Sequence, residues 1–197
     1  MYRTRRGVIC LRRIRNSIVF FTMCLFVLAF GVVPAAAESS DFDVYLKLDG
    51  ISGESVTKGY EKWIQLQDIS FEFENSSTLN SSSTTGSGAG KAVRKPMTFS
   101  KSFDLSSVPL FMDMVMGKTI EKGQLVFVRT GEQRIPIVTI DLERISVSKY
   151  NLYNLDENIE LNYGAINFKY TAVGPDGKTT NTNTNTGGWD FIKNVKK

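Results

Sequence analysis

From residue 44 onward, apolar side chains recur at every second position along several stretches of this chain. The clearest examples are Val44, Leu46 and Leu48 in one stretch and Met97, Phe99 and Phe103 in another. Successive side chains of a β-strand point to opposite faces, so this period of two is typical of strands with one buried face. The pattern predicts a mainly β fold.

Three longer segments change the phase of this alternation midway: residues 63–74, 135–148 and 159–173. In the last of them, Ile159, Leu161 and Tyr163 give way to Ile166 and Phe168. An extra residue at a bulge shifts a strand by one position, restores its core face and bends it. Long bent strands of this kind favour a small closed or nearly closed β-barrel. The alternative is that each segment is two short strands.

One short amphipathic helix is expected after the strand at residues 97–103. Ser106 or Ser107 can cap its start, and Pro109 suits a first turn, where its missing N–H costs nothing. Leu110, Phe111, Met114 and Val115 then follow at helical spacing. Gly117 is a typical C-terminal stop. We expect a helix of about ten residues to plug or flank the barrel.

Two segments are low in sequence complexity. Residues 75–90 consist almost wholly of Ser, Thr, Asn and Gly, and residues 179–188 form a Thr-Asn repeat that ends in two glycines. Neither segment has enough apolar surface to order itself alone. The sequence therefore predicts a loop over residues 75–90 and a second, low-complexity loop over residues 179–188.

The first 37 residues are typical of a secretory signal. Six arginines and no acidic residue precede an apolar run from Ile18 to Val33, which ends in Pro34 and three alanines. A basic start, an apolar centre and an Ala-x-Ala site are the three parts of such a signal, with Ala35 and Ala37 at the cleavage site. The apolar run is shorter than the ~20 residues that span a bilayer. We therefore expect a signal peptide at residues 1–37, a mature domain at residues 38–197, and membrane contact only before cleavage.

Removal of this leader changes which chemistry the chain can support. Its six arginines leave 18 Lys+Arg against 20 Asp+Glu, so the mature chain is slightly acidic and does not favour nucleic acid binding. Both cysteines, Cys10 and Cys24, lie in the leader, and the chain contains no histidine. The commonest general base and the commonest metal ligands are thus missing, so we expect no metal, no cofactor and no catalytic residue.

Two strings resemble phosphate-binding loops, and each departs from the pattern. Residues 86–91 read Gly-Ser-Gly-Ala-Gly-Lys, but Thr85 and Ala92 occupy the positions of the required glycine and hydroxyl. Gly117-Lys118-Thr119 lacks the first glycine and ends a helix, where carbonyl groups repel phosphate. The pair Asp141 and Glu143 is better explained as a solvated strand face than as a glycosidase pair.

The order of short motifs from residue 42 to residue 193 resembles the haemolysin-coregulated proteins (Hcp), which form the tube of bacterial type VI secretion. Residues 44–55, a short strand that ends in Asp-Gly and is followed by Gly-Glu-Ser, resemble the start of the family's sequences. Thr98-Phe99-Ser100-Lys101 and the helix that ends in Gly117-Lys118 follow in the family's order. The closing segment, Gly188-Trp189-Asp190 to Asn194, resembles the family's Gly-Trp-Asp end.

This resemblance implies a ring-forming structural protein without enzymatic activity. Family members form hexamers that stack into a tube, and the lumen carries effector proteins. The resemblance also implies that residues 75–95 form the family's long extended loop, which contacts the adjoining ring. This makes Ser87, Gly88, Gly90, Lys91, Arg94 and Lys95 candidate inter-ring residues. The expected partners are other copies of this chain, type VI secretion components and effectors. The leader adds an expectation of a secreted or periplasmic location. The alternative is an exported β-barrel binding module that acts outside the tube.

Overall fold

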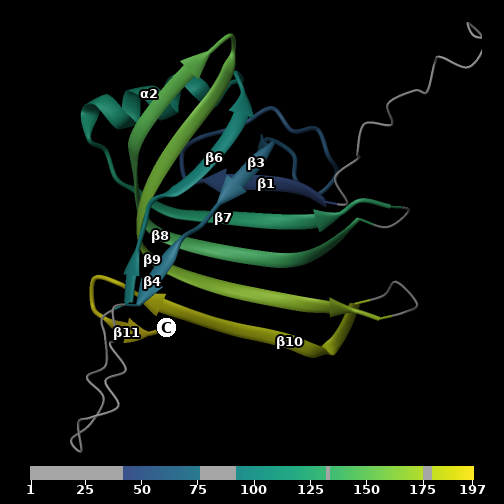
Figure 1. The fold of residues 1–197 in the computed structure, drawn as a ribbon. Helices are drawn as coiled ribbons and strands as arrows, with labels where there is room; N and C mark the ends of the chain where they lie inside the picture. Colours follow the sequence, from purple (N-terminus) through teal and green to yellow (C-terminus); the bar gives the residue numbers. More distant parts are fainter. Residues whose placement is uncertain (1–41, 76–91, 132–133, 175–178) are drawn as a thin grey trace, which may run out of the picture. The chain divides into compact units, whose positions relative to one another are not determined.

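The computed structural model describes residues 42–75, 92–131, 134–174 and 179–197. These residues form a mainly β structure with one helix (Figure 1). The main sheet runs in the order β11-β10-β9-β8-β7-β1-β2, and β6 joins it on β9, with β3 on the far side of β6. The strands of this sheet are β1 (Phe42–Leu48), β2 (Ile64–Leu66), β3 (Asp68–Ser70), β6 (Met97–Ser102), β7 (Ile120–Arg129), β8 (Ile135–Tyr153), β9 (Asp156–Val173), β10 (Thr179–Asp190) and β11 (Val195–Lys196).

The sheet curls into a nearly closed barrel. One residue, Gln67, separates β2, which pairs with β1, from β3, which pairs with β6. The Gln67 backbone N–H donates to Ser100 O at 2.9 Å, so the chain itself carries the sheet from β1 across to β6. Within the described residues no strand pairing joins β2 to β6, so the hydrogen-bonded sheet stays open there. The predicted mainly β fold with a nearly closed barrel and a short helix is confirmed.

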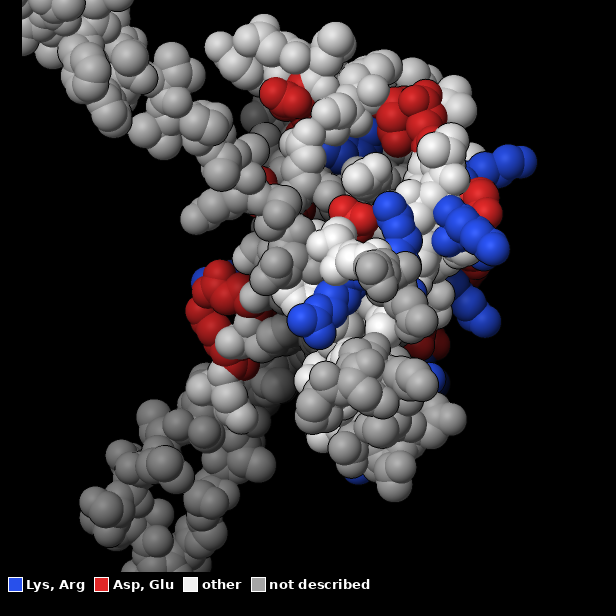
Figure 2. All heavy atoms as spheres, turned by 90° about the vertical axis from the view of Figure 1, so that its right-hand side faces the viewer, with Lys and Arg blue, Asp and Glu red and all other residues white. Residues whose placement is uncertain are grey.

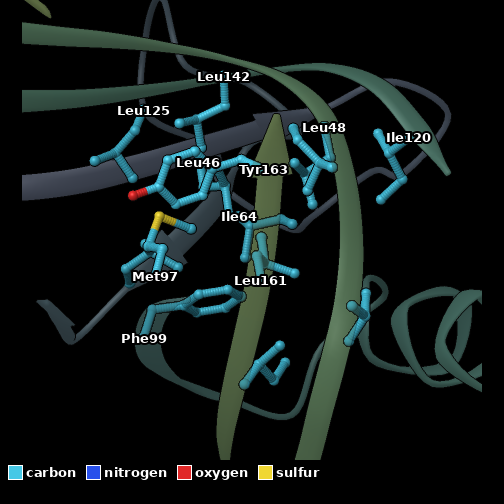
Figure 3. Packing of buried hydrophobic residues seen from close by; sticks show 14 of the residues in the cluster. Leu46, Leu48, Ile64, Met97, Phe99, Ile120, Leu125, Leu142, Leu161 and Tyr163 are labelled. Atoms are coloured by element: carbon cyan, nitrogen blue, oxygen red, sulfur yellow. The ribbon is translucent and has the colours of Figure 1, made fainter. Parts of the chain in front are cut away.

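The buried face that the alternation predicted forms the core. Figure 3 shows side chains from β1, β2, β6, β7, β8 and β9 pointing toward one another inside the barrel. Leu46, Ile64, Leu125, Leu161 and Tyr163 are each fully buried. Burying a large apolar side chain stabilises the fold by about 1.5–3 kcal/mol relative to leaving it exposed. The apolar side chains that recur at every second position therefore form the core, which is the main source of stability.

A second cluster covers the opposite face of β1 and β7. Tyr45 lies opposite Val126 in the β1–β7 register, and both are buried outside the barrel core. The Tyr45 ring stacks on Tyr60 at a centroid distance of 4.8 Å, and Trp63 meets Tyr60 edge to face at 5.3 Å. The segment between β1 and β2 thus covers part of the outer face, which is why Tyr45 is buried on the side of β1 that faces away from the core.

The phase changes in β8 and β9 meet at one bend. Arg144 has φ of 54°, in the left-handed region, and the register places it across from Gly164. The pairs on either side, Glu143 with Ala165 and Ile145 with Tyr163, are each two residues apart, so neither strand has an extra residue at this point. The predicted bulge is therefore wrong here, since the left-handed turn at Arg144 changes the face instead. The register shift in this strand pair lies further along, between Val147 and Lys149.

The predictions for the three long segments and for the second low-complexity loop have different outcomes. Residues 135–148 and 159–173 lie in single long strands, whereas residues 63–74 divide into β2, β3 and the start of a further strand. The predicted loop over residues 179–188 is wrong, because these residues belong to β10, which pairs with β9. A strand needs partners for its backbone groups, and β9 supplies them to a Thr-Asn repeat that could not order itself alone.

The helix, labelled α2 (Ser107–Met116), lies where the sequence placed it. Ser106 is the N-cap residue, but its side chain makes no capping bond and donates instead to Asp104. Pro109 lies in the first turn, and Gly117 ends the helix with φ of 64°, a left-handed conformation that glycine adopts without strain. The cap backbone N–H of Gly117 reaches Met114 O.

Candidate functional site: the base of the extended segment

A two-stranded ribbon forms the base of the predicted extended segment. Its strands are β4 (Phe73–Asn75) and β5 (Ala92–Arg94), which pair antiparallel with each other and with no strand of the main sheet among the described residues. Glu74 lies opposite Val93, and Phe73 opposite Arg94. A hairpin this short is not stable alone in water. Its position therefore depends on what it contacts on the barrel.

Aromatic rings fasten the ribbon to the barrel. Phe73 is half-exposed, yet its ring lies 6.2 Å from Phe168 in β9 and 6.3 Å from Phe191 in the C-terminal turn. Phe71, just before the ribbon, meets Phe168 at 6.4 Å and Tyr163 at 6.2 Å. Such aromatic pairs add about 0.5–1.5 kcal/mol beyond their buried area. Rings from three distant parts of the sequence thus meet at the ribbon base.

Arg94 completes this cluster from the second strand of the ribbon. Its guanidinium carbon lies 5.1 Å from the centre of the Tyr163 ring and 5.5 Å from that of Phe191. A guanidinium at this distance is attracted to the electron-rich ring face. Tyr163 is fully buried, and that burial raises the pKa of its hydroxyl to about 12. Arg94 therefore holds β5 against the barrel in the way that Phe73 holds β4.

Lys95 links the two sides of the ribbon at its exposed surface. Its Nζ forms ion pairs with Glu74 at 2.9 Å and with Glu72, and its backbone N–H donates to Glu72 O at 3.0 Å. The hydrogen bonds to Glu72 and Glu74 raise the pKa of Lys95. Exposed ion pairs contribute little to stability, so we assign Lys95 an orienting role and assign most of the attachment to the aromatic cluster.

The structure divides the predicted inter-ring residues into two groups. Arg94 and Lys95 lie at the ribbon base, each engaged with its own chain. Ser87, Gly88, Gly90 and Lys91 lie outside the described residues, as do Ala35 and Ala37 of the predicted cleavage site. Contact of the six predicted inter-ring residues with another ring, and cleavage of the leader, both stay predictions.

Sequence reasoning missed the aromatic cluster. The sequence places Phe71 and Phe73 in the segment 63–74, Phe168 in the segment 159–173 and Phe191 in the closing motif. Nothing in the spacing of these four residues indicates that they meet. The one available signal was the pair of phenylalanines next to the low-complexity segment. Only the folding of β9 beside the C-terminal turn brings the other rings to that place.

The terminal Gly-Trp-Asp motif has a clear structural role. Asp190 accepts backbone hydrogen bonds from Ile192 at 3.0 Å and Lys193 at 2.9 Å, and its second oxygen accepts from Arg144 at 2.8 Å. The backbone hydrogen bond from Lys193 is the main cause of a pKa of Asp190 below its ordinary value. Asp190 thus shapes the turn that carries Phe191 and ties that turn to the bend at Arg144.

Two other surfaces are available for contacts with partners. The outer side of β10 pairs with β11 at Trp189 and Asp190, and within the described residues no strand pairs with residues 179–187 on that side. The second surface is apolar, on α2 and the tip of the β8–β9 hairpin, where Val108, Val115, Met116, Tyr153 and Leu155 are all more than half exposed. An unpaired strand edge and an exposed apolar patch are both typical of interaction surfaces.

Polar side chains cover much of the remaining surface. In Figure 2, basic and acidic side chains are interspersed over the described part of the face shown. A hollow of about 560 Å³ on this domain has the same mixed character, with Lys47, Lys122, Asp141, Glu143 and Asn167 among its lining residues. No group of side chains within the described ranges has the composition of a metal site. None of the helices in these ranges is long and apolar enough to cross a membrane.

Comparisons with known proteins place this geometry in a family. The model of the family described as "Type VI secretion system effector, Hcp" matches residues 45–170. A solved structure described as a type six secretion system protein is 26% identical, with a TM-score of 0.72, and the match covers 79% of this chain and 99% of that one. No curated protein matches the chain.

Two further solved structures share the fold at lower identity. Hcp1 from Salmonella typhimurium is 22% identical with a TM-score of 0.64, and the match covers 80% of this chain and 100% of Hcp1. The secreted protein Hcp3 from Pseudomonas aeruginosa is 17% identical with a TM-score of 0.53, with 76% of this chain and 97% of Hcp3 covered.

Proposed function

Because this chain belongs to the Hcp family of type VI secretion proteins, we propose that it is a secreted tube protein that assembles into hexameric rings. The observation that carries the proposal is the family match over residues 45–170, combined with a fold that covers the whole length of its solved relatives. The protein's role is structural: its described surface offers edges and patches for assembly.

The unpaired edge of β10 supports the ring. A cyclic ring uses two different surfaces of each subunit, which meet head to tail and must close after a fixed number of copies. The described surface offers two such different regions: the side of β10 that pairs only with the short strand β11, and the exposed apolar patch on α2 and the tip of the β8–β9 hairpin. Coverage of such an edge by a neighbouring subunit would also protect it from uncontrolled pairing.

Light scattering after size exclusion tests the ring. Protein expressed from Glu38 should elute as a hexamer at tens of micromolar. A clean monomer would contradict the ring and favour the alternative, an exported β-barrel binding module that acts outside a contractile tube. Negative-stain microscopy of the same sample distinguishes single rings from stacked ones.

The extended segment supports stacking of rings along a tube. The ribbon strands end at Asn75 and begin again at Ala92, on either side of residues 76–91 in the sequence. Ordering a polar segment of this composition costs on the order of 1 kcal/mol or more per residue. We propose that contacts with an adjoining ring, made by Ser87, Gly88, Gly90 and Lys91, offset that cost, while Arg94 and Lys95 hold the base.

Replacing residues 76–88 with a short Gly-Ser linker tests this proposal. Both strands of the ribbon are kept, so the thermal stability of the barrel should be nearly unchanged. Tubes should become fewer or shorter by negative-stain microscopy, with rings retained. Equal tube formation would remove the stacking role, and unfolding would show that the segment is part of the core.

We also propose that residues 1–37 export the protein and are removed after Ala37, which places the mature protein in the periplasm or outside the cell. The basic start, the apolar run and the Ala-x-Ala site carry this proposal. Effector proteins are the proposed cargo, as the resemblance to the family's tube proteins implies.

A further inference from the structure

A fully buried lysine lies where helix α2 meets the barrel. The Nζ of Lys101, in β6, donates to Asp104 Oδ1 at 2.7 Å, to Ser107 Oγ at 2.9 Å and to Ser102 O at 3.0 Å. Lys101 also forms an ion pair with Glu157 of β9, which is equally buried and lies directly opposite it in the β6–β9 register. A buried charge is tolerated only when it is paired and hydrogen-bonded, and here both conditions are met.

The first residue of α2 joins the helix to this ion pair. The Ser107 hydroxyl donates to Glu157 Oε2 at 2.9 Å, and it accepts hydrogen bonds from Lys101 Nζ and from the Asp104 backbone N–H, both at 2.9 Å. One donor and two acceptor sites are all that a serine hydroxyl has, and all are used. The first residue of the helix therefore has every hydrogen-bonding site of its hydroxyl occupied by Lys101, Glu157 and the Asp104 backbone.

A tyrosine extends the network to a third strand. The Tyr150 hydroxyl, from β8, donates to Glu157 Oε1, so both oxygens of this carboxylate are hydrogen-bonded. Burial, together with this hydrogen bond, raises the pKa of Tyr150. The Tyr150 ring also meets Phe111 of α2 edge to face, with 5.7 Å between the centroids. The network thus joins β6, β8, β9 and the helix at a single place.

Apart from this network and the Phe111 contact, Leu110 and the partly buried Met114 are the described helix residues that pack against the barrel core. Besides Ser107, the buried residues of the helix are Leu110 and Asp113, and Asp113 pairs with Lys118 just beyond the helix end. The outer face is apolar and exposed, with Val108 60%, Val115 55% and Met116 60% accessible. Ser106, at the cap position, makes no side-chain capping bond. Polar contacts at the first turn therefore carry a large share of the attachment.

We propose that Lys101, Glu157 and Ser107 form a polar latch that fixes α2 on the barrel, and that opening this latch releases the helix as a unit while the barrel stays folded. The apolar core of the barrel is built from the strands, with Leu110 the one fully buried apolar side chain that the helix adds. The helix carries much of the exposed apolar surface described above, so the latch decides whether that surface has a fixed position. The inference does not depend on ring formation.

Substitution of Ser107 by alanine tests the latch without uncovering a charge, because Lys101 and Glu157 remain paired. Amide hydrogen exchange of residues 108–117, followed by mass spectrometry on the isolated domain, should become at least about fivefold faster, since local opening follows the lost buried hydrogen bonds. Exchange of residues 138–147 in β8 should stay within about twofold of the parent. Ser148→Ala is the matched control: this exposed serine donates to Glu160 O at 3.1 Å and does not belong to the network.

A charge-removal series provides a second measurement. Lys101→Met leaves the buried Glu157 and the partly buried Asp104 without their cation, so helix exchange should rise more than in Ser107→Ala. Adding Glu157→Gln to Lys101→Met removes one of these charges and should bring the exchange part of the way back. If Lys101→Met does not fold, the exchange rates of Ser107→Ala and its control Ser148→Ala are sufficient to test the latch. Unchanged exchange in the helix, or equal acceleration in helix and strands, would overturn the latch.

Discussion

At the scale of single residues, the bend of the sheet rests on a glycine that faces an arginine. A Cβ atom on Gly164 would lie 2.6 Å from Arg144 Nε and 2.7 Å from Ile192 Cδ1, closer than side chains pack. Arg144 in turn is held by Asp190, which shapes the C-terminal turn. Gly164, Arg144 and Asp190 thus connect the bend, the end of β10 and the terminal turn. A substitution at one of them should therefore change the packing of the other two.

Replacement of Gly164 by alanine should therefore destabilise the protein. We expect a loss of about 1–3 kcal/mol in the free energy of unfolding, the usual cost of overpacking, because Arg144 and Ile192 must both shift. Urea unfolding followed by tryptophan fluorescence measures this value. Gly187→Ala is the control, since nothing lies within 4 Å of its added Cβ, and a change within about 0.5 kcal/mol is expected. Equal effects at the two positions would contradict the packing argument.

The charge of Asp190 should make part of the stability depend on pH. Its pKa lies below the ordinary value of 3.8, so its contribution is present above that value and is lost as the pH falls through the lower folded-state pKa. Asp190→Asn should be destabilised most near neutral pH, and the gap to the parent should narrow below about pH 4. Thermal unfolding midpoints measured across this pH range test the prediction. A gap that stays constant with pH would mean that the charge of Asp190 plays no part.

At the scale of elements, the ribbon β4–β5 is a platform that the barrel holds by aromatic contacts. Two strands of three residues cannot persist alone, and β9 and the C-terminal turn supply the rings on which they rest. Phe73 and Arg94 thus fix the position of the ribbon itself on the barrel.

Phe73→Ala should loosen the ribbon selectively. Phe73 is 44% exposed, so we expect a global cost of about 2 kcal/mol, below the range for a fully buried phenylalanine. Amide exchange in residues 92–95 should rise more than exchange in β8. Phe103→Ala is a matched control, because Phe103 is 43% exposed and lies outside the aromatic cluster. If both variants loosen the ribbon equally, the cluster is not its anchor.

At the scale of the whole molecule, the proposed export and the proposed assembly are separate steps. The barrel core and the surfaces that we propose for assembly lie among the described residues, and residues 1–37 contain the predicted export signal. A secreted ring protein that carries its own signal would assemble after translocation, whereas a tube built inside the cell would need a chain that keeps to the cytoplasm.

N-terminal sequencing of protein from the envelope and culture fractions should distinguish these routes. Cleavage after Ala37 predicts a mature chain that begins at Glu38, because the small residues at Ala35 and Ala37 form the recognition site. An Ala37→Leu variant should accumulate as the uncleaved precursor, while Ala36→Leu, at the position between them, should be processed normally. Full-length protein in the cytoplasm would contradict export and support assembly inside the cell.

The sequence by itself determined the β class, the positions of β1, β6, β8 and β9 and the limits of the helix, but it did not predict the central strand β7. These features depend on local chemistry: a two-residue period for Val44 to Leu48, a proline in the first turn and a glycine at Gly117. The order of short motifs in the sequence also indicated the resemblance to Hcp proteins, which the family match confirms.

The tertiary structure decided the features that depend on distant partners. The Thr-Asn repeat became strand β10 because β9 offers it backbone partners, and the phase changes of β8 and β9 became one bend because Arg144 faces Gly164. Phe73, Phe191 and Arg94 became the ribbon anchor for the same reason. Pairing register and packing are properties of residues brought together by folding, and no local pattern in the chain encodes which ones will meet.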